Sequence, residues 1–187
     1  MDSKIILVGG YCATGKSTFS HRLSKMLGLP CFNKDSLKEA VADGFGSGSE
    51  EAREKGSSAT FGLMLHIAER FLQTGQACIL EANFRRLETE RIAILLAQYN
   101  AKCLTFAFTG DLDSIYDRYV TRDQSGTRHW VHLEAGNRSS FKSAHVQAGL
   151  GEIAIGQTVR VDAMAFEKID YEALFALARK FMHGKNG

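Results

Sequence analysis

Short apolar runs alternate along the chain with longer segments in which apolar residues recur every three or four positions. The runs predict buried strands, and the three-to-four spacing predicts helices with one apolar face. The expected strands are residues 5–8, 29–32, 77–80, 103–108 and 158–161. The expected helices are residues 17–27, 35–42, 59–73, 86–99, 112–121 and 171–182. Because strands alternate with helices throughout, we expect a three-layer α/β fold, a five-stranded parallel sheet flanked by helices.

Two polar segments interrupt this pattern. Residues 43–49 are rich in glycine and serine, and with the charged residues 50–55 behind them they predict a mobile segment. Residues 124–143 are polar and basic, which indicates a lid or an insertion rather than a part of the core. A length of 187 residues suits one domain. We therefore expect a single domain over residues 1–187 with a lid at about residues 124–143.

Composition and charge favour an ordinary globular protein, with 44% hydrophobic and 24% charged residues. A net charge of +2 gives no argument for a nucleic-acid or membrane partner. No apolar run reaches the roughly 18 residues of a membrane span, and the first residues lead directly into an expected strand. We therefore expect a cytoplasmic protein with reduced cysteines. Three of the four cysteines lie in or beside apolar strands, whereas Cys12 falls in a loop where it could be accessible.

One loop carries a pattern with a specific chemistry. Residues 10–17, Gly-Tyr-Cys-Ala-Thr-Gly-Lys-Ser, fit the Walker A motif G-x-x-x-x-G-K-[ST] between the first strand and the first helix. The glycines let backbone N–H groups turn onto phosphate oxygens, and the helix presents its positive dipole end to them. A solvent-facing Lys16 would reach the β- and γ-phosphates, and the Ser17 hydroxyl would bind Mg²⁺. The nucleotide, expected to be ATP, would be bound by Gly10, Tyr11, Cys12, Ala13, Thr14, Gly15, Lys16, Ser17 and Thr18.

A carboxylate follows the second expected strand, at the sheet edge where ligands of open α/β folds bind. Phosphoryl transfer needs a carboxylate that orients the acceptor hydroxyl or takes its proton, and Asp35 is the candidate. On spacing alone, a purely structural role for Asp35 as a helix cap is equally favoured. Asp at a helix start is an ordinary N-cap, and the stretch from Ser36 to Glu39 could form a capping box.

A second carboxylate, Glu81, ends the third expected strand. In the manner of a Walker B acid it would hold Mg²⁺ or its water. The alternative is an ion pair with Arg85 or Arg86, which open the next helix and could instead clamp an anionic part of the acceptor. The expected acceptor-binding residues are thus Asp35, Glu81, Arg85 and Arg86, and the expected metal ligands are Ser17 and Glu81.

Three arginines lie near or within the expected lid. Arg118 and Arg122 are four residues apart on the face opposite the apolar stripe of their helix, and Arg128 follows them. Guanidinium groups that close over the γ-phosphoryl oxygens would stabilise the charge that spreads over them in the transition state. The alternative is an ordinary solvated helix face.

Several segments together resemble a known family. They are residues 10–17, Asn-Lys-Asp-Ser-Leu-Lys-Glu at 33–39, Leu-Glu-Ala-Asn-Phe at 80–84, Asp-Arg-Tyr-Val-Thr-Arg at 117–122 and Ser-Gly-Thr-Arg-His-Trp-Val-His at 125–132. From Lys4 to about Tyr171 their order and spacing resemble the small P-loop kinases of the AAA type. These kinases are related to zeta toxin, chloramphenicol phosphotransferase and the polynucleotide 5′-hydroxyl kinase domain. The chain departs from the family at residues 130–131, Trp-Val in place of the usual Pro-Gly between two lid histidines, and at Ala82 in place of glycine.

The resemblance implies a P-loop NTPase fold with strand order 2-3-1-4-5. It also implies that Asp35 acts on the acceptor hydroxyl and that the lid arginines Arg122 and Arg128 contact phosphates. The expected catalytic residues are therefore Lys16, Asp35, Arg122 and Arg128, and Arg118 is counted with the nucleotide-binding residues.

These observations favour an ATP- and Mg²⁺-dependent kinase that phosphorylates a hydroxyl of a small-molecule acceptor. A polynucleotide 5′-hydroxyl kinase is the second candidate, but it would need a basic channel with stacking aromatic side chains, and the near-neutral charge gives little support. A non-catalytic ATP-binding switch is the third, and it would not need Asp35 or the lid arginines. A plain NTPase is the remaining alternative.

Overall fold

The computed structural model describes residues 3–45, 50–124, 126, 129–132 and 136–184. The strands are β1 (Lys4–Gly10), β2 (Cys31–Asn33), β3 (Cys78–Glu81), β4 (Lys102–Thr109) and β5 (Gln157–Asp162). The helices are α1 (Lys16–Leu27), α2 (Lys34–Phe45), α3 (Glu50–Gln73), α4 (Arg86–Gln98), α5 (Leu112–Asp123), α6 (Arg138–Gln147) and α7 (Tyr171–His183). A short 3₁₀ helix, η1 (Phe166–Lys168), precedes α7.

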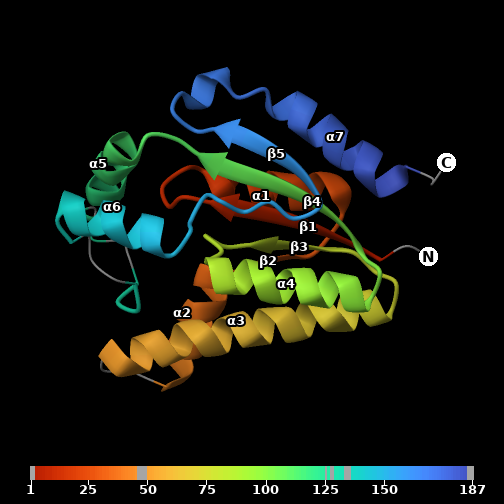
Figure 1. Ribbon diagram of the computed structural model, residues 1–187, viewed down its shortest axis with the longest axis horizontal. Coiled ribbons are helices and arrows are strands. Elements are labelled where there is room, and N and C mark those ends of the chain that lie inside the picture. The colour runs from red at the N-terminus through yellow and green to blue at the C-terminus, as the bar shows by residue number, and fades with distance from the viewer. Residues whose placement is uncertain (1–2, 46–49, 125, 127–128, 133–135, 185–187) are drawn as a thin grey trace.

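The strands form one parallel five-stranded sheet in the order β2-β3-β1-β4-β5. This confirms the predicted fold class and strand order. β1 lies at the centre, so the loop that follows it emerges in the middle of the carboxyl edge of the sheet. Helices cover both faces, with α3 and α4 on one side of the sheet and α7 on the other (Figure 1).

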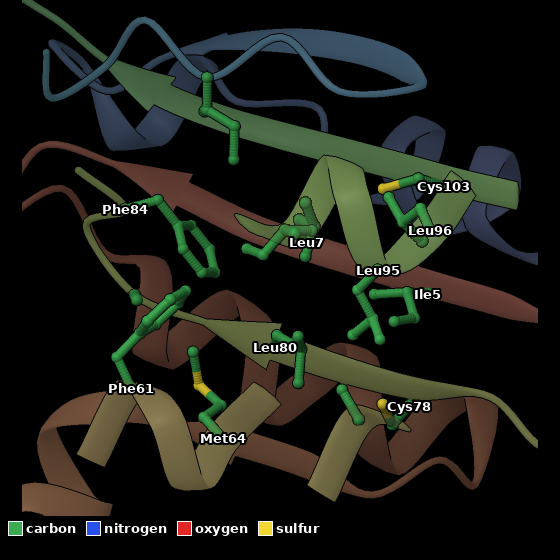
Figure 2. Packing of buried hydrophobic residues seen from close by; sticks show 14 of the residues in the cluster. Ile5, Leu7, Phe61, Met64, Cys78, Leu80, Phe84, Leu95, Leu96 and Cys103 are labelled. Atoms are coloured by element: carbon green, nitrogen blue, oxygen red, sulfur yellow. The ribbon is translucent and has the colours of Figure 1, made fainter. Parts of the chain in front are cut away.

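Alternate residues of β1 supply the two halves of the core. Ile5 and Leu7 pack with α3 and α4, in the cluster that Figure 2 shows, which includes Phe61 and Met64. Ile6 and Val8 point the other way, toward residues of α1 and α7. A central strand that is buried on both faces explains why its sequence is a continuous apolar run.

Some boundaries differ from the sequence-based predictions. The segment expected to be mobile, residues 43–55, is helical at both ends, because α2 continues to Phe45 and α3 begins at Glu50, while residues 46–49 lie outside the described residues. The expected lid contains part of a helix, α6, whose Phe141 is buried against α5. No helix within the described residues is long and apolar enough to span a membrane.

Candidate active site

The Walker A loop lies between β1 and α1, and its backbone is held by contacts on both sides. The N–H of Tyr11 donates to the carbonyl of Phe108 at 2.9 Å, and the Thr14 hydroxyl donates to the carbonyl of Tyr11 at 2.7 Å. Gly10 has φ of 121°, and a Cβ there would lie 1.9 Å from the Phe108 oxygen. Only glycine fits a loop that leaves the sheet so close to β4.

Lys16 is the first residue of α1, and its side chain is buried rather than solvent-facing as we expected, with 6% exposed. Its ammonium donates to the carbonyl of Tyr11, inside the loop. Burial lowers the pKa of Lys16, and nearby Cys12, Glu81 and Asp35 oppose that lowering. A cation held in this way among carboxylates, inside a loop, is suited to receive an anion that replaces the carbonyl contact.

Glu81 and Ser17, the two residues predicted to bind the metal, are in direct contact. The Glu81 side chain is 3% exposed and accepts hydrogen bonds of 2.7 Å from the hydroxyls of Ser17 and Ser20. The predicted alternative, a pair with Arg85 or Arg86, is wrong for Arg86, because that side chain pairs with Glu152 at 3.0 Å. Carboxylate and hydroxyl oxygens suit Mg²⁺, which takes few protein ligands and keeps several waters.

Ser20 is a site residue that sequence reasoning missed. It lies one helical turn after Ser17, so both hydroxyls of α1 reach the same carboxylate. The spacing of two serines across an N-terminal turn that faces a strand-end acid is the signal that could have identified it.

Asp35 is exposed on the first turn of α2 and does not cap the helix. Asn33 precedes the helix, and its side-chain oxygen accepts from the N–H of Ser36 at 2.8 Å, which is the geometry of an N-cap. The capping alternative for Asp35 is therefore wrong. Its carboxylate is close enough to Lys16 to raise the pKa of that lysine.

A cavity of about 470 Å³ opens beside this edge, between α1, β2, α2 and β3. Ser17, Ser20 and Glu81 lie at its α1 and β3 walls, and Phe32 and Asn33 form part of its β2 wall. Its volume suits a small molecule next to the expected position of the metal.

The predicted arginines lie in different environments. Arg122 lies near enough to Lys16 to lower the pKa of that lysine, and its guanidinium lies 5.5 Å from the ring centre of Tyr119. Arg85 is exposed at the start of α4, and Arg86 is bound to Glu152 outside the site. Arg128 lies outside the described residues.

Arg118 holds the segment that follows β5. Its guanidinium donates to the carbonyls of Ala163 and Met164 and stacks on Phe166 at 4.6 Å. Phe166 in turn lies against the loop, because a Cβ at Gly15 would meet its ring at 3.2 Å. Arg118 is therefore connected to the phosphate loop through the ring of Phe166.

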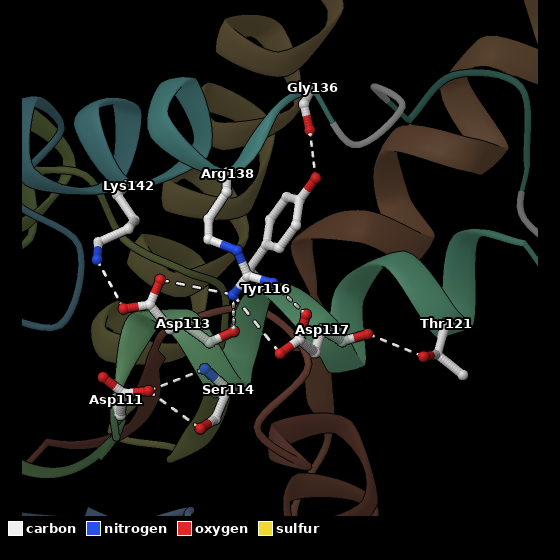
Figure 3. A network of polar contacts seen from close by, with 9 residues as sticks. All are labelled: Asp111, Asp113, Ser114, Tyr116, Asp117, Thr121, Gly136, Arg138 and Lys142. Atoms are coloured by element: carbon white, nitrogen blue, oxygen red, sulfur yellow. Dashed lines mark hydrogen bonds and ion pairs between the residues drawn. The ribbon is translucent and has the colours of Figure 1, made fainter.

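α6 is fixed on α5 by a polar network (Figure 3). The guanidinium of Arg138 donates to Asp117 at 2.5 Å, Lys142 binds Asp113 at 2.7 Å, and the Tyr116 hydroxyl donates to a backbone carbonyl of the preceding loop at 3.0 Å. This part of the expected lid is thus packed on α5 and carries no described contact to the carboxylates of the site.

Residues 129–132 of the expected lid lie along α2. His132 is 2.6 Å from Glu39 and His129 is 3.0 Å from Asp43, while Lys38 donates to a lid carbonyl at 3.1 Å. Asp35, Glu39 and Asp43 follow at four-residue spacing on one face of α2. Residues 129–132 therefore contact the same face of α2 one and two turns after Asp35.

Cys12 is less accessible than we expected. Its side chain is 9% exposed and packs with residues of α5 and α6, including Ile115 and Phe141. Its sulfur lies 3.5 Å from Nε2 of His145, a contact that joins residues 133 positions apart in the sequence.

Comparison with known proteins gives one family and several related structures. A model of the AAA domain family matches residues 5–148. A comparison with curated proteins finds no match. A solved structure from Chloroflexus aurantiacus, described as a kinase, has a TM-score of 0.83 and 30% sequence identity, covering 96% of this chain and 98% of its own.

More distant solved structures share the fold. A shikimate kinase from Bacteroides thetaiotaomicron has a TM-score of 0.57 and 14% identity, covering 96% of this chain and 98% of its own. A gluconokinase from Sinorhizobium meliloti has a TM-score of 0.55 and 16% identity, covering 95% of this chain and 92% of its own. The parallel sheet with a phosphate loop after its central strand is thus a fold found in kinases of small molecules.

Proposed function

The chain belongs to the AAA domain family, and from this we propose that it is an ATP-dependent kinase that phosphorylates a hydroxyl group of a small molecule. The observation that carries the proposal is the convergence of three charged groups at the carboxyl edge of the sheet. The Glu81 and Asp35 carboxylates both lie near enough to Lys16 to raise the pKa of that lysine, and Glu81 also accepts from the Ser17 hydroxyl. Within the AAA-type kinases, we propose that the chain falls in the group related to zeta toxin, chloramphenicol phosphotransferase and the polynucleotide 5′-hydroxyl kinase domain.

In the proposed reaction the backbone N–H groups of the loop and Lys16 bind the β- and γ-phosphates. Ser17 and Glu81 would hold Mg²⁺, which neutralises charge on the phosphates when it is bound. Ser20 keeps the Glu81 carboxylate oriented through its 2.7 Å hydrogen bond.

Asp35 accepts or orients the proton of the acceptor hydroxyl, which then attacks the γ-phosphorus in line with the leaving oxygen. The cavity beside Ser17 and Glu81 receives the acceptor, and the exposed Arg85 is available for an anionic group of it. Arg122, in the last turn of α5, and Arg128, in the lid, stabilise the transferring phosphoryl group, and we place the lid at residues 124–143 of a single domain.

A screen of ATP consumption tests this proposal. Purified protein with ATP and Mg²⁺ is offered sugars, nucleosides, aminoglycosides, phenicols and 5′-hydroxyl oligonucleotides, and ADP release and phosphorylated product are measured. We expect at least one small hydroxyl compound to raise ADP release and to appear phosphorylated. Stimulation by oligonucleotides alone would instead assign a polynucleotide kinase, and ATP binding without turnover in any mixture would assign a binding module.

A further inference from the structure

Cys12, in the phosphate loop, and His145, on α6, form a thiol–imidazole pair. The sulfur of Cys12 lies 3.5 Å from Nε2 of His145, and both side chains are more than nine-tenths buried. No step of the proposed phosphoryl transfer uses either side chain. The pair therefore needs an explanation beyond the kinase reaction.

The orientation of His145 makes its Nε2 an acceptor. Its Nδ1 lies 2.8 Å from the carbonyl oxygen of Phe141, which can only accept, so Nδ1 carries the hydrogen. Burial lowers the pKa of His145, so the ring is held in its neutral form with the Nε2 lone pair facing the sulfur. The ring is fixed further by the rings of Phe141, at 4.0 Å, and Tyr11, at 5.6 Å. A nucleophile, a base and a group that orients the base are thus present together.

Positive charge near Cys12 favours its thiolate. Lys16 lies close enough for the charge of Cys12 to raise the lysine pKa, and the same attraction stabilises a negative sulfur. The N-terminus of α1 adds a positive dipole end four residues after Cys12.

Within the described residues, the other three cysteines have no histidine at hydrogen-bond distance, and the polar side-chain contact of Cys103 is the Thr105 hydroxyl at 3.7 Å. Burial raises the pKa of Cys31 to about 11 and those of Cys78 and Cys103 to about 12. They serve as controls within the same molecule.

We propose that Cys12 is a site of oxidation by hydroperoxides, with His145 as the base, and that this oxidation prevents the loop from binding nucleotide. The thiol proton passes to Nε2 of His145, and the thiolate attacks one oxygen of hydrogen peroxide. An S–O bond forms as the O–O bond breaks, and the departing hydroxide takes the proton from the imidazolium and leaves as water. Sulfur is oxidised by two electrons to a sulfenic acid, and the peroxide is reduced.

The consequence for nucleotide binding follows from the surroundings of the sulfur and rests on the proposed function. The new oxygen adds volume beside a buried, close-packed cluster that contains Ile115, Tyr119 and Phe141, where an extra atom is costly. The loop can accommodate this oxygen only if Cys12 moves, and movement disturbs the Tyr11 carbonyl that holds Lys16 and Thr14. A thiol reductant restores the sulfhydryl and the loop.

The oxidation is tested without nucleotide. Protein is exposed to hydrogen peroxide for increasing times, denatured in iodoacetamide so that remaining thiols are alkylated whatever their burial, and analysed by peptide mass spectrometry. We expect Cys12 to lose its thiol at least about 10-fold faster than Cys31, Cys78 or Cys103, because general base catalysis contributes factors of this size or larger. Equal rates at all four cysteines would overturn the proposal, and this comparison needs no variant.

His145→Gln tests the role of the base. The variant is expected to slow the oxidation of Cys12 about 10-fold, while His66→Gln, an exposed position on α3, leaves the rate unchanged. An unchanged Cys12 rate in folded His145→Gln protein would refute the assignment of His145.

Calorimetry with Mg²⁺ and ATP tests the consequence. Peroxide-treated wild type should lose binding and regain it after a thiol reductant, whereas Cys12→Ser should bind equally with and without peroxide. Oxidised Cys12 with unchanged ATP affinity would overturn the regulatory part of the proposal. Failure of the untreated wild type to bind ATP would instead refute the proposed function and leave the comparison of cysteine rates intact.

Discussion

Two neighbouring substitutions should separate helix capping from chemistry at the start of α2. Asn33→Ala removes the oxygen that accepts from the N–H of Ser36 at 2.8 Å. Loss of such a cap costs about 1 kcal/mol, which in a domain of this size lowers the melting temperature by about 2–4 °C. Asp35→Asn changes an exposed side chain that caps nothing, so its stability should stay within about 0.5 kcal/mol of wild type.

For turnover we expect the opposite ranking, with the larger loss in Asp35→Asn. Asp35→Asn removes the carboxylate that would orient or deprotonate the acceptor, so transfer should fall by about 10² or more with ATP affinity nearly unchanged. Asn33→Ala also alters the wall of the acceptor cavity, so at temperatures where it is folded it should lose some turnover, but less than Asp35→Asn. Thermal melts and ADP release, with the acceptor or as basal hydrolysis, measure both quantities. If Asp35→Asn melted lower and turned over normally, Asp35 would be structural and Glu81 would be the remaining candidate base.

Two further predictions concern the loop and its support. Ser20→Ala removes a hydrogen bond to the buried Glu81 carboxylate and should cost about 2 kcal/mol, or about 4–8 °C in melting temperature, whereas Ser24→Ala removes a bond to a neutral carbonyl and should cost about half as much. Equal losses of stability in Ser20→Ala and Ser24→Ala would argue against a hydrogen bond to a charged Glu81 carboxylate. Gly10→Ala should not fold, because its Cβ would lie 1.9 Å from a backbone oxygen, while Gly28→Ala, with nothing within 4 Å, should lose only about 1 kcal/mol. A soluble, cooperatively melting Gly10→Ala would contradict the loop geometry.

The sequence was sufficient for the fold class because apolar runs mark most of the strands and alternate with amphipathic helices. The strand order came from the resemblance and not from periodicity, since a run such as residues 5–8 does not say which strand lies beside it. Element ends were harder to predict. Glycine and serine at residues 43–49 indicate a break, but they do not show that α2 reaches Phe45 before it.

Within the site, the sequence identified groups that follow a strand but not contacts between distant elements. Spacing left open whether Asp35 caps α2 or acts in catalysis, and the structure shows that Asn33, two positions earlier, accepts the hydrogen bond from Ser36 and caps the helix. The pairing of Cys12 with His145 depends on the packing of α6 under the loop, which no local pattern encodes.

Calorimetric titration of ATP in the presence of Mg²⁺ into wild type and Lys16→Ala tests the central claim most directly, because each proposal places the nucleotide on this loop. Loss of one charge-assisted contact of about 1.5–3 kcal/mol predicts binding at least about 10-fold weaker in Lys16→Ala. The same titration in Lys25→Ala, which removes a cation from the far end of α1, should match wild type. Equal affinity in wild type and Lys16→Ala would show that the loop is not the nucleotide site.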